Sequence, residues 1–75
     1  MKVLQHKGIA GVVKERRVQG KISGHLLVDG GFAFYGDTVE EMTDDFKKAV
    51  EAYFEACELM DIEPELVERP DGKEV

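Results

Sequence analysis

The stretch from Gly36 to Met60 constrains the fold of this chain most, because its pattern specifies one long amphipathic helix. Hydrophobic residues recur there mostly at steps of three or four, which places them along one side of a helix with 3.6 residues per turn. Charged residues, most of them acidic, occupy the other side. No second helix of comparable length can be read, so a sheet or another chain must cover the hydrophobic side. Its members are Val39, Met42, Phe46, Ala49, Val50, Tyr53, Cys57 and Met60.

The start of this helix carries its own signal. The hydroxyl of Thr38 can accept a hydrogen bond from an amide of the first turn, and Glu41 follows three residues later, as in a capping box. Asp37 followed by Glu40 fits the same arrangement one residue earlier, so two boundaries stay open. Negative charge in this turn also suits the positive end of the helix dipole. Pro64 sets the outer limit of the helix at its other end.

Three segments before the helix read as strands, and the middle one is the clearest. Residues 18–26 alternate strictly between apolar or small residues and polar residues, a pattern typical of a half-buried strand. Glycines at its inward positions predict a helix backbone packed close to this strand. Residues 8–15 and 32–35 form the flanking strands, whereas residues 1–7 show no strong pattern. The inward set is Val18, Gly20, Ile22, Gly24 and Leu26.

Short connections between these strands predict an antiparallel meander with the long helix packed across one face. After the helix, residues 65–69 are a candidate for a fourth, edge strand, residues 70–72 read as a turn, and the last residues are expected to be loose. The predicted fold class is therefore α+β, in the order β-β-β-α-β, as a single domain over residues 1–75. A thin core and free sheet edges predict a homodimer or a higher homo-oligomer.

Composition narrows the classes of function. The chain has 16 acidic and 10 basic side chains and a net charge of −6, which disfavours direct binding to nucleic acid and favours a basic protein partner. No apolar stretch is long enough to span a membrane, and residues 1–4 are too short for a signal peptide. The single cysteine, Cys57, lies on the apolar side of the helix and reads as a core residue. We therefore expect a cytoplasmic protein.

No arrangement of residues typical of an enzyme is found. His6 and His25 are far apart, and neither has a spacing to Cys57 that recruits a metal ion, so we interpret both as solvated side chains. Phosphate-binding loops and nucleophile motifs are missing. The acidic pairs at residues 40–41 and 44–45 read as a solvated helix face rather than a metal site. The expectation is a protein that is not an enzyme and needs no cofactor or metal.

The order of the motifs resembles the HicB-type antitoxins of bacterial type II toxin–antitoxin pairs. Residues 7–15 resemble the first strand of that family, and residues 18–24 resemble the second, with Val18 in place of the usual aromatic residue. Phe34 and Gly36 match the Phe-x-Gly that precedes the helix. The resemblance covers residues 7–64, and no motif within it is catalytic. Within the helix and its start, the matching residues are Gly36, Thr38, Val39, Glu41, Phe46, Val50, Tyr53 and Cys57.

This resemblance implies a partial RNase H-like fold and the function of an antitoxin, which binds a small, basic, RNA-cleaving toxin and masks its active surface. The DNA-binding segment that continues typical members of the family is not carried over to this chain. The alternative is a stand-alone, self-associating HicB-like domain with a regulatory or structural role and no cognate toxin. The residues that we expect to contact a partner are Glu40, Asp44, Asp45, Glu51, Phe32 and Tyr35.

Overall fold

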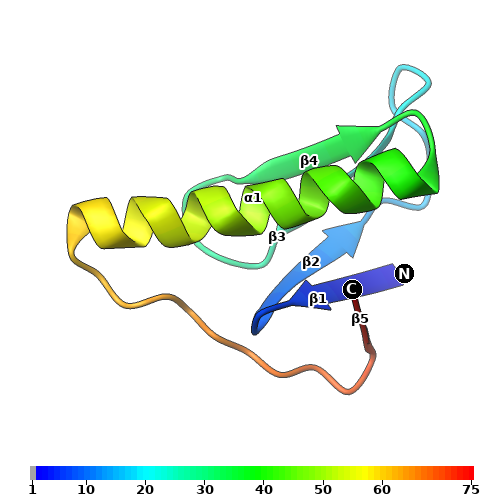
Figure 1. The fold of residues 1–75 in the computed structure, drawn as a ribbon. Coiled ribbons are helices and arrows are strands. Elements are labelled where there is room, and N and C mark those ends of the chain that lie inside the picture. The colour runs from blue at the N-terminus through cyan, green and yellow to red at the C-terminus, as the bar shows by residue number, and fades with distance from the viewer. Residues whose placement is uncertain (1) are drawn as a thin grey trace.

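The computed structural model describes residues 2–75, which form a five-stranded mixed sheet with one helix packed on one face (Figure 1). The strands lie in the order β4-β3-β2-β1-β5, and all neighbours are antiparallel except β1 and β5, which are parallel. The predicted α+β class is confirmed, with β2, β3 and β4 forming the antiparallel meander that precedes the helix. The elements are β1 (Lys2–His6), β2 (Ile9–Val13), β3 (Ile22–Leu26), β4 (Ala33–Gly36), α1 (Val39–Met60) and β5 (Gly72–Glu74).

Strand β1 falls in a segment where the sequence shows no strong pattern, so the prediction for residues 2–6 was wrong. The reason is its position between β2 and β5 in the sheet. The consecutive side chains Val3 and Leu4 are 4% and 2% exposed, so both faces of the strand are covered. A strand that is buried on both faces loses the alternation by which half-buried strands are recognised.

Two hairpin turns are built from a glycine preceded by a residue other than asparagine or aspartate. Lys7 and Gly8 join β1 to β2 with φ angles of 52° and 82°, and Gln19 and Gly20 have φ angles of 52° and 79°. Positive φ at both central residues defines the type I′ turn, whose twist matches that of the flanking strands. The Val18–Lys21 bridge closes the second turn, with N···O distances of 2.9 Å and 3.0 Å.

This second turn corrects the predicted span of β3. The strand covers only Ile22–Leu26, and Gly20 serves the turn instead of occupying an inward position. Val18, which we expected to face inward, is 47% exposed. The alternation of apolar and polar residues continues through the turn, because a two-residue turn reverses the chain without interrupting that pattern. The sequence therefore does not show where the strand begins.

The glycines that do lie inside the fold make room for two different groups. A Cβ atom on Gly24 would lie 2.6 Å from the Phe34 ring and collide with the carbonyl oxygen of Val12, so the strand glycine accommodates an aromatic ring and a neighbouring strand. The predicted close approach of the helix backbone occurs instead at Gly36. A Cβ there would lie 2.8 Å from the carbonyl carbon of Glu41 and still closer to the next amide.

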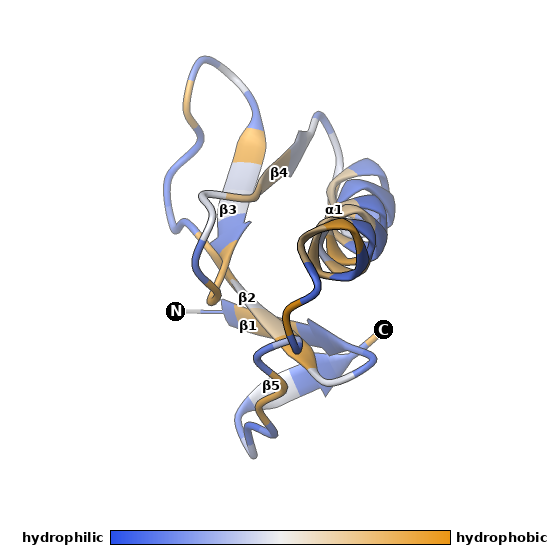
Figure 2. Cartoon of the chain, turned by 90° about the vertical axis from the view of Figure 1, so that its left-hand side faces the viewer, coloured by the Kyte–Doolittle hydropathy of each residue, from blue (hydrophilic) through white to orange (hydrophobic). Residues whose placement is uncertain are grey.

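The core lies between α1 and the sheet. Phe34 from β4 and Phe46 from α1 are both fully buried and meet edge to face with their ring centroids 5.1 Å apart. Figure 2 looks along α1 and shows its hydrophobic colours towards the strands and its hydrophilic colours on the outer side. Val39 and Met60, the first and last residues of the predicted hydrophobic side of the helix, are 53% and 69% exposed. The buried helix residues are Met42, Phe46, Val50, Tyr53 and Cys57.

The chain after the helix runs beneath the turn between β1 and β2 and returns to the sheet beside β1 (Figure 1). Residues 65–69, the predicted edge strand, are irregular, although the Val67 amide donates to the carbonyl oxygen of Gly8 at 2.8 Å. The edge strand is β5 instead. The expectation of a loose end was also wrong, since the Val75 amide donates to Gln5 at 3.0 Å.

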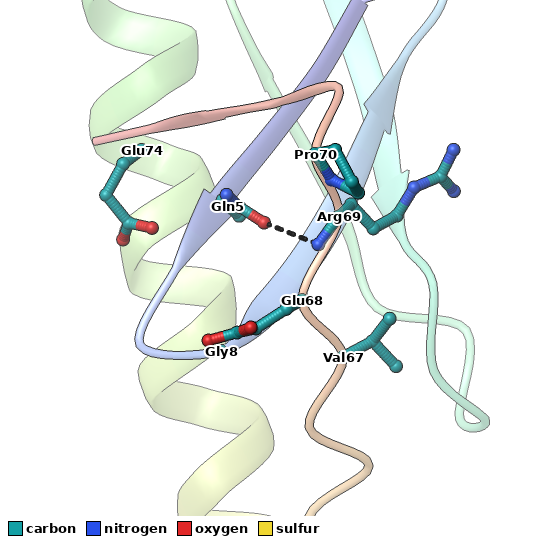
Figure 3. A pocket seen from close by; sticks show the side chains of 7 residues that line it. All are labelled: Gln5, Gly8, Val67, Glu68, Arg69, Pro70 and Glu74. Carbon is teal, nitrogen blue, oxygen red and sulfur yellow. Dashed lines mark hydrogen bonds between the residues drawn. The ribbon is translucent and has the colours of Figure 1, made fainter.

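Gln5 explains how this segment is held. Its side-chain amide donates to the Gly72 carbonyl at 3.2 Å, and its side-chain oxygen accepts from the Arg69 amide at 3.2 Å. The second of these bonds is drawn in Figure 3. One side chain from β1 therefore fixes both ends of the turn that leads into β5.

Among residues 2–75, no helix is long and apolar enough to cross a membrane.

Candidate protein-binding surface

The described residues contain no cluster with the geometry of a metal site. In residues 2–75, no three His, Cys, Asp or Glu side chains lie where they could hold one ion together. The His6 ring nitrogen Nδ1 lies 2.6 Å from the Val75 carbonyl oxygen, and Cys57 is buried in the core. His25 is exposed. Surfaces that another protein can contact are therefore the candidates for a functional site.

The first half of α1 places one predicted contact residue, Asp45, against another, Tyr35, at the edge of the sheet. The Asp45 carboxylate accepts a hydrogen bond at 3.0 Å from the backbone amide of Tyr35. Leu26 in β3 donates to Phe32, and hydrogen-bonded pairs alternate along an antiparallel ladder, so this Tyr35 amide points away from β3. Asp45 thus occupies a donor of the open β4 edge, and an occupied edge is a poorer template for pairing with another strand.

Around this contact lies a shallow hollow of about 300 Å³. Asp44, a predicted contact residue, lines it, and Lys21 at its border forms a 2.7 Å ion pair with Asp37. The hydrogen bond to Asp37 raises the pKa of the Lys21 ammonium. Arg17 also donates to the Asp37 carbonyl at 3.1 Å, so the basic turn between β2 and β3 is attached to the start of α1. Glu40 is exposed in the first helical turn.

The remaining two predicted residues lie elsewhere. Glu51 forms a 2.6 Å ion pair with Lys7 of the turn between β1 and β2, and that bond lowers the pKa of its carboxyl group. Phe32 packs edge to face on Tyr53, with ring centroids 5.5 Å apart. The structure therefore brings Asp44, Asp45 and Tyr35 together but does not unite the six residues in one patch.

The hollow drawn in Figure 3 lies between β1, β5 and the returning chain, and has a volume of about 350 Å³. The polar atoms of Gln5 at its floor already bond to Arg69 and Gly72. An exposed pair between Arg69 and Asp71, at 2.9 Å, lies at its border. The hydrogen-bonding groups of Gln5 therefore serve the fold, and we do not assign a ligand to this hollow.

A different hollow, with an apolar lining, lies at the end of α1. It measures about 330 Å³, and we call it the α1-end groove. Tyr53 in its wall is 3% exposed, and burial raises the pKa of its phenol above the ordinary value of 10.0. The phenol oxygen accepts from the Glu65 amide at 2.8 Å, and the Glu65 carboxylate accepts from the Asp29 amide at 3.0 Å. The lining residues are Asp29, Gly30, Phe32, Tyr53, Ala56, Cys57, Met60 and Ile62.

Sequence reasoning missed most of this groove. Of its lining, only Phe32 was among the predicted contact residues. A signal was present in the run Leu59, Met60 and Ile62, which supplies more large apolar side chains than one helix face can bury. These three are 81%, 69% and 53% exposed.

Charge is distributed unevenly around the groove. Residues 49–68, which comprise the second half of α1 and the chain that follows it, contain no lysine or arginine. Their charged residues are Glu51, Glu55, Glu58, Asp61, Glu63, Glu65 and Glu68. Six of the ten basic residues lie instead between β2 and β3 or on the first half of α1. Lys7 pairs with Glu51, and the other acidic residues of the segment surround the apolar side chains at the end of α1 without a basic residue among them in the sequence.

Comparisons of the chain with protein-family models, with curated proteins and with solved structures give no match. The resemblance to the HicB-type antitoxins therefore rests on the ordered set of residues between positions 7 and 64.

Proposed function

We propose that this chain is a protein-binding module of the antitoxin type, which neutralises a small, basic, RNA-cleaving protein by covering its active surface. The observation that carries the proposal is the acidic segment of residues 49–68, which contains no lysine or arginine and flanks a groove of apolar residues. A protein that cleaves RNA must attract a polyanion, so its active surface is basic. An acidic helix is complementary to such a surface and competes with RNA for it.

The mechanism is steric and electrostatic. Complementary charge accelerates the encounter, and contact in the apolar groove slows dissociation. Neither step requires a catalytic residue in this chain. Self-association without a toxin remains the alternative, although Asp45 already occupies a donor on the β4 edge where strand pairing was expected.

Affinity purification of the tagged chain from its source lysate at low salt tests this proposal, with bound proteins identified by mass. We expect a small basic protein that cleaves RNA when it is freed and stops when the chain is added back. Elution by raised salt is expected as well, because exposed charge pairs are screened. Recovery of the chain alone, at every salt concentration, contradicts the proposal and favours the self-associating domain.

A further inference from the structure

The α1-end groove differs from the other hollows in being walled by hydrophobic side chains whose outer members are largely exposed. Among its lining residues, Tyr53 and Cys57 are 3% and 2% exposed, whereas Met60 and Ile62 are 69% and 53% exposed. In Figure 2 the ribbon at the end of α1 that faces the viewer is coloured hydrophobic. Large apolar side chains gathered in one place at a surface mark sites of contact with another molecule.

The last turn of α1, which contributes Met60 to the groove, is electrostatically unfavourable in the isolated chain. The last turn of α1 contains no basic residue, although the C-terminal end of a helix carries partial negative charge. Glu58 and Asp61 add full negative charges at this end, and Glu63 follows. A cation from a partner would be stabilised there by the helix dipole and by these carboxylates together.

We propose that the α1-end groove takes one or two large apolar side chains from a basic segment of a partner protein, with flanking Lys or Arg side chains placed on Asp29, which lines the groove, and on Asp61 and Glu63, which alternate with Met60 and Ile62 in the chain. This inference rests on the proposed function, because it locates on this chain the contact that a basic partner makes. The volume of about 330 Å³ lies at the lower end of the range of about 300–1,000 Å³ typical of ligand pockets, which suits a side-chain anchor.

Charge argues against other occupants of the groove. A second copy related by a two-fold axis through the groove would bring the acidic residues of the two copies together. Like charges in such an interface repel each other. An anionic membrane surface or a nucleic acid meets the same repulsion. A basic segment with apolar side chains is complementary both to the apolar lining of the groove and to the acidic residues beside it.

The test uses nuclear magnetic resonance on the isotope-labelled full chain and a synthetic Lys/Arg-rich peptide that carries a Phe and a Leu three residues apart. We expect shifts of the Ala56, Met60 and Ile62 signals on titration. The same peptide with Phe and Leu changed to Ala should bind about tenfold or more weakly, since burial of a large apolar side chain is lost. Replacing its basic residues by Glu should abolish the shifts.

Variants of the chain provide the matched controls. Ile62→Ser should weaken peptide binding about tenfold, while Val39→Ser, at a residue that is also 53% exposed but at the other end of α1, should leave it unchanged. Glu63→Lys, next to Ile62, should weaken binding, and Glu40→Lys should have little effect. Both residues of each pair are exposed, and circular dichroism of each variant is expected to match that of the parent chain.

The outcomes separate this inference from the proposed function. Shifts that centre on the first half of α1, equal binding of the Glu-substituted peptide, or the same shifts on raising the protein concentration without peptide would each overturn the inference. A basic partner that is captured equally well by Ile62→Ser and by the parent chain also overturns it, while the proposed function stands. Peptide binding in the groove with no basic partner in the lysate supports the groove and counts against the antitoxin proposal.

Discussion

The first and the last turn of α1 differ in how the rest of the chain meets them. At the start, Thr38 accepts from the Glu41 amide at 3.1 Å, which confirms the predicted cap, and Asp37 receives both Lys21 and Arg17. At the end, Asp61 takes a left-handed conformation with φ of 54°, and the neighbouring Leu59 is 81% exposed. The first turn is fixed by the fold, whereas the last turn offers surface that the fold does not use.

The largest expected difference between the two regions comes from their hydrophobic residues. Phe46→Ala should destabilise the chain by about 3–5 kcal/mol, because it leaves a cavity against Phe34. Leu59→Ala is the control on the same helix and should change the free energy of unfolding by less than about 0.5 kcal/mol. Urea denaturation followed by circular dichroism measures both, and similar effects of the two changes would contradict the division of α1 into a structural and an exposed part.

Gly36→Ala tests the tight entry into the first turn. The added Cβ meets the helix backbone near Glu41 and Met42, which cannot move without displacing the cap. We expect a loss of about 1–3 kcal/mol, the range for overpacked sites. Gly31→Ala controls for removal of a glycine, because a Cβ on Gly31 meets nothing within 4 Å, although its φ of 69° adds a small strain of its own. Equal losses would contradict the view that the contact at Gly36 costs more than the strain at positive φ.

Thr38→Ala removes the cap of the first turn. The Glu41 amide loses its acceptor, and the free energy of unfolding should fall by about 0.5–2 kcal/mol. Thr38→Ser keeps the hydroxyl and should retain most of the stability. Thermal unfolding of the three proteins decides the matter, and a Ser variant as weak as the Ala variant would show that the hydroxyl is not what stabilises this turn.

Tyr53→Phe tests the contact that ties the far half of α1 to the returning chain. At neutral pH we expect a loss of about 0.5–1.5 kcal/mol, since the Glu65 amide loses its acceptor. Burial raises the pKa of the Tyr53 phenol above 10.0, so the unfolded chain releases this proton first and the parent loses stability as the pH rises past 10.0. The variant lacks that contribution, and its stability should fall less steeply in alkaline urea titrations. Parallel curves would show that the phenol is not buried.

The smallest expected effect is a gain at the last turn. Asp61→Gly relieves the left-handed backbone conformation and removes a negative charge from the negative end of α1, which together should stabilise the chain by about 0.5–1 kcal/mol. Asp61→Asn removes the charge alone and separates the two causes. A loss of stability on Asp61→Gly would contradict the view that this end is unfavourable in the isolated chain.

The candidate surface divides in the same way between what the sequence reveals and what it hides. The acidic side of α1 follows directly from the spacing of its residues, and Glu40 and Asp44 are exposed as expected. The α1-end groove does not, because its wall joins Phe32, from before the helix, to Ile62, from after it. No pattern within either stretch of the sequence indicates that these two segments lie close together in the fold.

The sequence by itself determined the helix, its cap at Thr38 and the meander of β2, β3 and β4, because each depends on interactions between residues close together in the chain. Only the tertiary structure decided the place of β1 and β5. Their parallel pairing, in which Leu4 lies opposite Lys73, joins the two ends of the chain. Because β1 is buried on both faces, its sequence lacks the alternation of apolar and polar residues by which a half-buried strand is recognised. The three residues of β5 are too few to show any period.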